Sequence, residues 1–143
     1  MCLRDRRNLR PLSLGSLFLW DPSLSPEEYE ARIARGMALA AKVRYLHPFI
    51  QPMIPGHSKS AWDPCARVLA ARSDDELEPH LYQLFEWLQD RNWPGADIIW
   101  DRLLRFSFSR LESIHSLVCT VARRTGDDIW LEVLEDFQKE ARK

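Results

Sequence analysis

Residues 85–96 read FEWLQDRNWPGA, a stretch that joins the end of one expected helix to the start of another. Apolar residues close the first helix, polar residues form a corner, and Pro94 starts the second helix, where a fixed φ and a missing N–H are tolerated. Two large indoles, Trp87 and Trp93, mark the corner. The sequence therefore predicts a helical hairpin at this point.

Apolar residues spaced three and four apart continue on both sides of the corner, as in amphipathic helices. The clearest stripe runs through Leu77, Leu81, Leu84 and Leu88. About six helices are expected: one from Pro26 to about Leu46, one over roughly residues 61–72, one from Asp74 through Leu88, one from Pro94, one from Ser109, and a last one after Thr125-Gly126-Asp127. No stretch alternates as a half-buried strand does, so no strand is expected.

Three of these helices carry a capping signal at their start. A serine followed three residues later by a glutamate forms a capping box, in which both side chains satisfy backbone N–H groups of the first turn. The pairs are Ser25 with Glu28, Ser73 with Glu76, and Ser109 with Glu112. By contrast, residues 47–56 contain three prolines, which oppose a regular helix or a central strand. We expect an ordered, extended connector there, held by Phe49, Met53 and Ile54.

The expected fold is all-α. Because the connections are short, consecutive helices are expected to pack against each other as antiparallel pairs. A faint repeat supports stacked helical units, since Asp97, Ile98, Leu103 and Phe106 recur 31 positions later as Asp128, Ile129, Leu134 and Phe137. We therefore expect a single HEAT-like helical domain over residues 25–143.

Residues 1–24 form the expected N-terminal arm, either flexible or partly docked through Leu17, Phe18 and Trp20. An arginine-rich start followed by an apolar stretch imitates a secretory signal. However, Ser13, Gly15 and Ser16 interrupt the apolar stretch, and no small-residue cleavage site follows. We therefore expect no export and a cytoplasmic location.

Composition narrows the classes of partner. The chain has 143 residues, is 45% hydrophobic and 29% charged, and carries a formal net charge of −1. These values are typical of one globular domain, and they supply neither the basic surface of a nucleic-acid binder nor a bias toward membranes. Cys2, Cys65 and Cys119 are odd in number and lack metal-like spacing, so we expect free thiols in a reducing compartment.

Several motifs along residues 49–103 have a recognisable pattern: Phe49-Ile50-Gln51-Pro52, Lys59, Trp62, Cys65-Ala66, Arg72-Ser73-Asp74, Glu76-Leu77, Glu86-Trp87-Leu88-Gln89-Asp90, Asn92-Trp93-Pro94-Gly95-Ala96 and Arg102-Leu103. Together they resemble one bacterial family, domain-of-unknown-function family 5071. The resemblance covers residues 48–106 well and the flanking helices loosely. It implies a small helical-repeat domain in a cytosolic bacterial protein, with no established enzymatic activity, in a family some of whose members occur beside toxin-immunity loci.

Candidate chemical residues do not assemble into a recognised site. His47, His57, His80 and His115 have no paired-histidine metal spacing. Asp97 and Asp101 share one helical face and could serve a metal-assisted hydrolase together with a histidine. The favoured interpretation is that Asp97 complements a helix N-terminus and Asp101 pairs with Arg105. We expect no catalytic activity, no cofactor and no metal.

The sequence favours a non-enzymatic, protein-binding domain, in its most specific form an immunity-type protein that neutralises a cognate toxin. The alternative is a self-associating scaffold or accessory protein, a homo-oligomer; a hydrolase is less favoured. Two surfaces are candidates for the partner. One is the acidic patch of Asp74, Asp75 and Glu78 beside Tyr82, and the other is the corner of Asp90, Arg91 and Trp93. For both, a purely structural use is favoured, since the acids start a helix and the corner builds a hairpin.

Overall fold

A computed structural model describes residues 2–4, 11–13, 18, 20–51 and 59–143. Helices dominate it, which confirms the all-α fold class. The α-helices are α2 (Pro26–Ala40), α3 (Trp62–Ala70), α4 (Asp74–Leu77), α5 (Leu81–Glu86), α6 (Ala96–Leu104), α7 (Phe108–Thr125) and α8 (Asp128–Ala141). Four single turns of 3-10 helix, η1 (His47–Phe49), η2 (Lys59–Ala61), η3 (Glu78–His80) and η4 (Trp87–Gln89), complete the helical elements.

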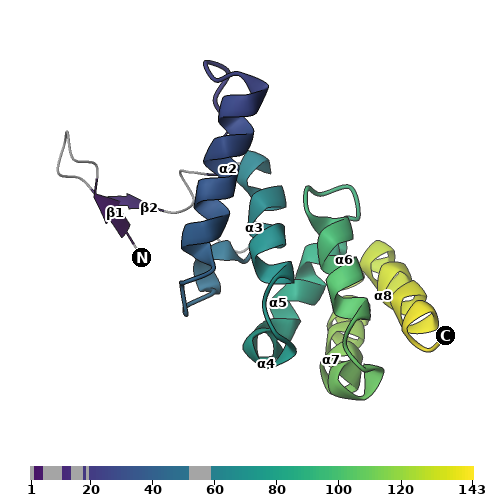
Figure 1. Cartoon of the computed structure of the whole chain (residues 1–143). Helices are drawn as coiled ribbons and strands as arrows, with labels where there is room; N and C mark the ends of the chain where they lie inside the picture. Colours follow the sequence, from purple (N-terminus) through teal and green to yellow (C-terminus); the bar gives the residue numbers. More distant parts are fainter. Residues whose placement is uncertain (1, 5–10, 14–17, 19, 52–58) are drawn as a thin grey trace.

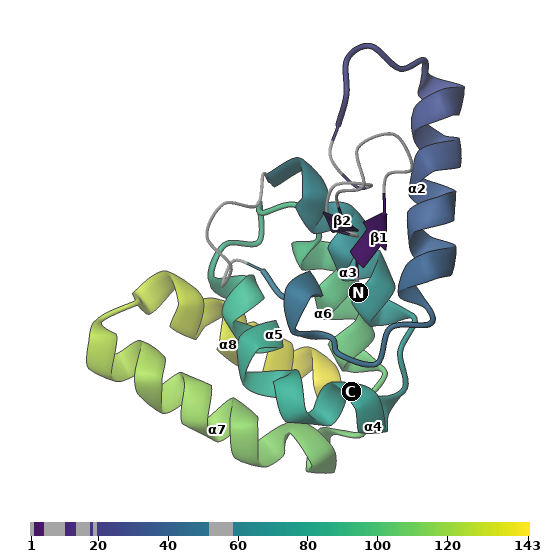
Figure 2. The same cartoon turned by 90° about the vertical axis from the view of Figure 1, so that its left-hand side faces the viewer.

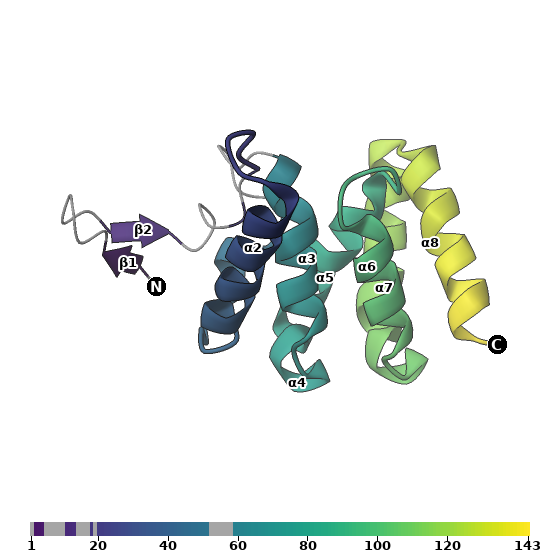
Figure 3. The same cartoon turned by 45° about the horizontal axis from the view of Figure 1, so that its top comes forward.

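The helices are arranged in two layers. Figures 1 and 3 show α2, α3, α6 and α8 side by side in a row, and α2 packs on α3, α3 on α6, and α6 on α8. Helices α5 and α7 pack on each other and lie on one side of this row (Figure 2). The row therefore has two ends, α2 and α8. HEAT-like repeat character stays a prediction.

Helix α2 begins as expected but ends early. Its start has the complete capping box of Ser25 and Glu28, followed by Pro26. It ends at Ala40 rather than near Leu46, because the chain turns there to bury Val43 and Leu46. Arg72 Nη2 donates to the carbonyl of Ala40 at 2.6 Å and to that of Val43, so the carbonyls freed by this turn are satisfied.

The prediction of a single helix from Asp74 through Leu88 is wrong, because Pro79 interrupts the segment. Proline has no N–H to donate, and its ring crowds the carbonyl of the preceding turn. The segment divides into α4, η3, α5 and η4, and His80, the last residue of η3 and the N-cap of α5, has φ −111°. The predicted capping box of Ser73 and Glu76 is present. Leu77, Leu81, Leu84 and Leu88 are all buried, so the apolar stripe is confirmed.

The hairpin corner differs from the expectation in one respect: Pro94 does not start the helix. Gly95 occupies the N-cap position with φ +81°, and α6 begins at Ala96. A side chain at Gly95 would also lie 2.7 Å from the Cβ atom of Ala66. A left-handed backbone in contact with α3 therefore requires glycine here. Trp87 Nε1 closes the corner by donating to the Pro94 carbonyl at 3.0 Å.

The fifth expected helix starts earlier than the Ser109 signal indicated. Helix α7 begins at Phe108 with Ser107 as N-cap, and the Ser107 and Ser109 hydroxyls lie 3.2 Å apart. The end of α7 is as predicted: Gly126 adopts φ +70°, and Asp127 caps α8 by accepting from the Trp130 N–H at 3.0 Å. A left-handed glycine followed by a capping aspartate is a local signal, and the structure confirms the helix end and start that it predicts.

Two other segments correct the expectations. Residues 2–4 and 11–13 form strands β1 (Cys2–Arg4) and β2 (Pro11–Ser13), an antiparallel pair in which Leu3 is opposite Leu12. Three residues are too few for an alternating pattern, so no strand was expected. In the connector, His47–Phe49 forms the 3-10 turn η1 rather than an extended chain. Phe49 is buried, whereas the predicted anchors Met53 and Ile54 lie outside the described residues.

Large aromatic side chains fill much of the core between the layers. Trp62, Trp87 and Trp130 are buried, and Trp130 Nε1 donates to the Phe85 carbonyl at 3.0 Å. Phe18, from the expected arm, is also fully buried, while Trp20 stays 61% exposed and Leu17 lies outside the described residues.

Within the described part of the chain, no helix has the length and hydropathy needed to traverse a lipid bilayer.

Candidate functional site

The acidic patch on α4 and η3 is engaged within the protein. Arg102, on α6, binds the Asp74 carboxylate through Nη2 at 2.6 Å. Arg110, on α7, reaches Asp75 at 2.8 Å and also pairs with Glu78. Asp74 lies 3.7 Å from Arg110 as well. The acids therefore join the start of α4 to both following helices, in addition to their place near a helix N-terminus.

Two arginines of this cluster lie close to an aromatic ring. The guanidinium carbons of Arg102 and Arg110 lie 5.0 and 5.6 Å from the centroid of the Phe106 ring. The hydrogen bonds that Arg110 donates to Glu78 and Asp75 raise the pKa of Arg110. Arg102 is only 5% exposed and also donates to the Arg72 carbonyl at 2.8 Å. Because its charge is buried, Asp74 is the counterion it requires.

Tyr82 does not belong to this cluster. Its ring is half-buried and packs against the hydrophobic core. No hydrogen bond in the described part of the chain connects the Tyr82 hydroxyl to Asp74, Asp75 or Glu78. The four residues of the predicted acidic surface are therefore not one site in the structure.

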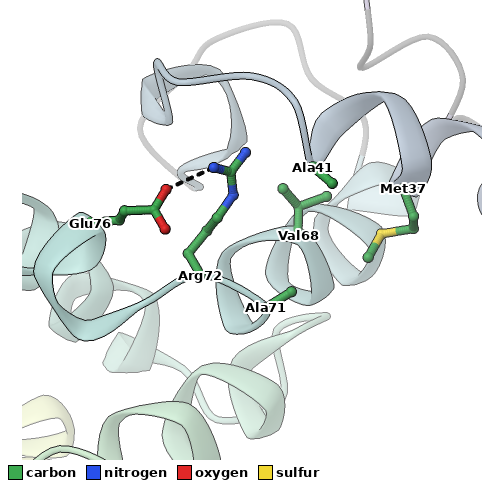
Figure 4. A pocket seen from close by; sticks show the side chains of 6 residues that line it. All are labelled: Met37, Ala41, Val68, Ala71, Arg72 and Glu76. Carbon is green, nitrogen blue, oxygen red and sulfur yellow. Dashed lines mark hydrogen bonds and ion pairs between the residues drawn. The ribbon is translucent and has the colours of Figure 1, made fainter.

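Arg72 lies in a pocket of about 200 Å³ between α2, α3 and α4 (Figure 4). The side chain is 10% exposed, and Nη1 binds Glu76 at 2.8 Å. Nη2 donates to the carbonyl of Ala40, the last residue of α2, and to that of Val43 in the turn that follows. The hydrogen bond that Arg72 Nη1 donates to Glu76, together with one from the Ser73 backbone N–H, lowers the pKa of Glu76. The pocket is lined by Met37, Ala41, Val68, Ala71, Arg72 and Glu76. The hydrogen bonds of Arg72 go to the protein itself, so this arginine joins α2 to α4.

Two side chains of the 90–93 corner, those of Asp90 and Trp93, stabilise it. The Asp90 carboxylate accepts from the Asn92 N–H at 2.8 Å, and the Asp90 carbonyl accepts from the Trp93 N–H at 3.0 Å. The Trp93 ring packs edge-on against Trp62, with centroids 5.5 Å apart, and Trp62 packs similarly on Trp87 at 6.2 Å. Asp90 and Trp93 therefore have the structural use that the sequence favoured.

The side chain of Arg91 builds neither the turn nor the indole cluster. Its guanidinium stacks on Trp100 of α6, 4.0 Å from the ring centroid, and Nη2 binds Asp97 at 2.5 Å. The side chain is 35% exposed and that of Asp97 78% exposed. Arg91, Trp100 and Asp97 thus form a cation–aromatic–carboxylate group on the surface, held in one geometry by two contacts.

The carboxylate pair considered for hydrolysis is divided between different contacts. Asp97 pairs with Arg91, as above, while Arg105 donates to the Ala70 carbonyl at 2.7 Å instead of pairing with Asp101. Over residues 20–51 and 59–143, no three His, Cys, Asp or Glu side chains gather as metal ligands do. One spacing that the sequence reasoning missed is Glu112 with His115, a Glu-x-x-His pair, but Glu112 is exposed and lies 3.7 Å from Arg142.

Among the described histidines and thiols, His115 and Cys119 are neighbours in the core. His115 is buried among aromatic rings; its Nε2 lies 2.7 Å from the Leu134 carbonyl, and Cys119 Sγ is 3.9 Å from the ring nitrogens. Cys65 and Cys119 are buried free thiols, as predicted, and burial raises the pKa of Cys65 to about 12. Burial, and then the charge of His47, lower the pKa of His80. His57 lies outside the described residues.

Comparison with known proteins identifies one family. Searches among curated proteins and among solved structures gave no significant match. The sequence profile of the family described as "Domain of unknown function (DUF5071)" matches residues 58–142, more than half of the chain. The match extends from just before α3 to the end of α8, so it includes the corner and the arginine–acid cluster and excludes α2. The chain therefore belongs to the DUF5071 family, as residues 85–96 and the neighbouring motifs indicated.

Proposed function

We propose that this protein is a non-enzymatic, protein-binding domain whose partner contacts the corner at Arg91. The observation that carries the proposal is the group formed by Arg91, Trp100 and Asp97, with the guanidinium 4.0 Å from the indole and a salt bridge of 2.5 Å. Arginine and tryptophan are the residue types that contribute most to protein interfaces. A side chain already fixed in its geometry also loses little entropy on binding.

The position of this group in the chain supports the proposal. Arg91 and Trp100 lie within the part of the chain matched by the family, so a surface there can serve a function shared by its members. The corner beneath Arg91 is rigid, because Trp87 and Trp93 are held by a hydrogen bond and by edge-on ring contacts. The acidic patch is a weaker candidate, since Arg102 and Arg110 already neutralise much of its charge.

In the most specific form of the proposal, the protein is a cytosolic bacterial immunity protein that binds and neutralises a toxin encoded beside it. This form rests on the loci in which some relatives of the family occur. A self-associating scaffold or accessory protein is the alternative, and a feature of α2 described below favours self-association. The two functions differ in the partner that each requires, a toxin in one case and a second copy of the chain in the other.

A pull-down from the native host with the full chain tests the proposal. Arg91→Ala is expected to weaken capture of the partner at least about tenfold, the typical loss when an interface anchor is truncated. Arg142→Ala is the matched control, because Arg142 stacks on Phe108 at 4.9 Å and lies near the carboxylate of Glu112. Equal capture by both variants would place the partner elsewhere. A neighbouring gene whose product is toxic alone and harmless with this protein would establish the immunity form.

A further inference from the structure

Helix α2, one end of the helical row, has an outward face unlike that of α8 at the other end (Figures 1 and 3). The exposed positions of α8 are charged except for Ile129. On α2, exposed Ala31 and Ala38 lie on the side opposite the buried residues Ile33, Gly36 and Ala40. A terminal helix that only capped a stack would carry polar residues at such positions.

The same face is hollowed where Ala31 is located. A pocket of about 490 Å³ is lined by Leu24, Glu28, Ala31, Arg32 and Arg35. The small side chain of Ala31 leaves room between longer neighbours, so the backbone of another helix can approach α2 closely here. Leu24 adds apolar surface at one end of the hollow. Beyond its other end, the exposed Ala38 adds further apolar surface along α2.

The charges on this face are separated along the helix. Glu27 and Glu28 lie in the first turn, and Arg35 lies two turns later on the same side. No salt bridge connects Glu27 or Arg35 to another residue within the described part of the chain. An antiparallel copy of the helix would bring its Arg35 to Glu27, and its Glu27 to Arg35, so the face complements itself.

We propose that this face binds a second copy of the chain, with the two α2 helices antiparallel about a twofold axis at Ala31. In this register Ala31 meets its own counterpart, and Glu27 meets Arg35, because Glu27 and Arg35 both lie four residues from Ala31 along α2. The small residue on the axis permits close packing, each dimer has two Glu27–Arg35 pairs, and antiparallel helix dipoles add attraction. This inference does not depend on the function proposed for Arg91.

Charge exchange tests the register directly. Glu27→Arg places like charges opposite Arg35, and Arg35→Glu does the same opposite Glu27, so each variant alone is expected to associate at least about tenfold more weakly than wild type. An equimolar mixture of the two variants should associate as well as wild type, because in the mixed dimer position 27 of each copy again faces an opposite charge at position 35 of the other. Glu132→Arg, on the exposed side of α8, is the control and should leave association unchanged.

Sedimentation velocity of the full-length chain from about 1 to 100 μM is the measurement, the range in which a small interface assembles. Wild type should shift from 16.8 kDa toward twice that mass as concentration rises. Circular dichroism of each variant establishes that it is folded. A wild type that stays monomeric, or folded single variants that associate like wild type, would overturn the proposal. So would a mixture that remains monomeric, or loss of association in Glu132→Arg.

Discussion

Arg102 on α6 donates to the carboxylate of Asp74 across 2.6 Å, and this contact joins α6 to the first turn of α4. The two residues are 28 positions apart in the sequence. Arg102 is 5% exposed, so its charge has little solvent to stabilise it. The acidic start of α4 is therefore held in place by later helices as well as by its own capping box.

Removing Asp74 should destabilise the protein far more than removing its neighbour. Asp74→Ala leaves the buried Arg102 without its counterion and is expected to cost about 3 kcal/mol of unfolding free energy. Asp75→Ala removes a side chain that is 91% exposed, and should cost less than about 1 kcal/mol. Urea denaturation of both variants measures the difference. Equal losses would show that Asp74 is not the required partner of Arg102.

Two glutamates should affect the pH dependence of stability with opposite signs. The pKa of Glu76 is lowered by the Arg72 hydrogen bond, so its stabilisation is present above the unfolded-state pKa of 4.5 and is lost as the pH falls through the lower folded value. The pKa of Glu86 is raised by burial, so its favourable contribution is present below 4.5 and is lost as the pH rises through the folded value.

Glu86→Gln should therefore stabilise the protein at pH 7, and this gain should shrink as the pH falls toward 4.5. Glu76→Gln should destabilise it at pH 7, with a loss that shrinks at acid pH. Urea unfolding at a series of pH values gives both curves. Parallel curves for the two variants would contradict the opposite pKa shifts.

The two left-handed glycines should respond differently to alanine. At Gly126, with φ +70° and nothing within 4 Å of an added Cβ, alanine should cost about 1 kcal/mol from the backbone conformation alone. At Gly95, with φ +81°, the added Cβ would also lie 2.7 Å from the Cβ of Ala66, so the cost should exceed about 2 kcal/mol. Thermal unfolding of both variants measures these losses. A Gly95→Ala variant no less stable than Gly126→Ala would show that α3 yields at this contact.

Structural features that depend only on neighbouring residues, such as helix caps and tight turns, could be predicted from the sequence. The capping box of Ser73 and Glu76 and the glycine–aspartate turn at 126–127 both operate within one helical turn, so the residues that produce them are adjacent in the chain. The hairpin corner was recognised for the same reason. The break at Pro79 in the Asp74–Leu88 segment could be predicted in the same way, because it follows from the missing N–H of proline alone.

The contacts that form the candidate site could not be predicted, because they join residues that are separated in the sequence. Nothing near Arg91 in the sequence indicates that its guanidinium stacks on Trp100, because that contact requires the corner to place α6 beneath it. Arg72 likewise donates to the carbonyls of Val43 and Ala40, in the turn after α2 and at its last residue, which are 29 and 32 positions away. The acidic patch was visible as a run of charges, but the sequence could not show that Arg102 and Arg110 would neutralise much of it.

By itself, the sequence determined the helical class, most helix starts and the family, because apolar spacing, caps and turns are local properties of the chain. Tertiary structure alone decided where α2 ends, which arginines the acids bind, and which face of α2 has no neighbouring helix among the described elements. The physical reason is that a side chain's charge and shape are encoded at its own position, whereas its burial and its partners depend on helices brought together by folding.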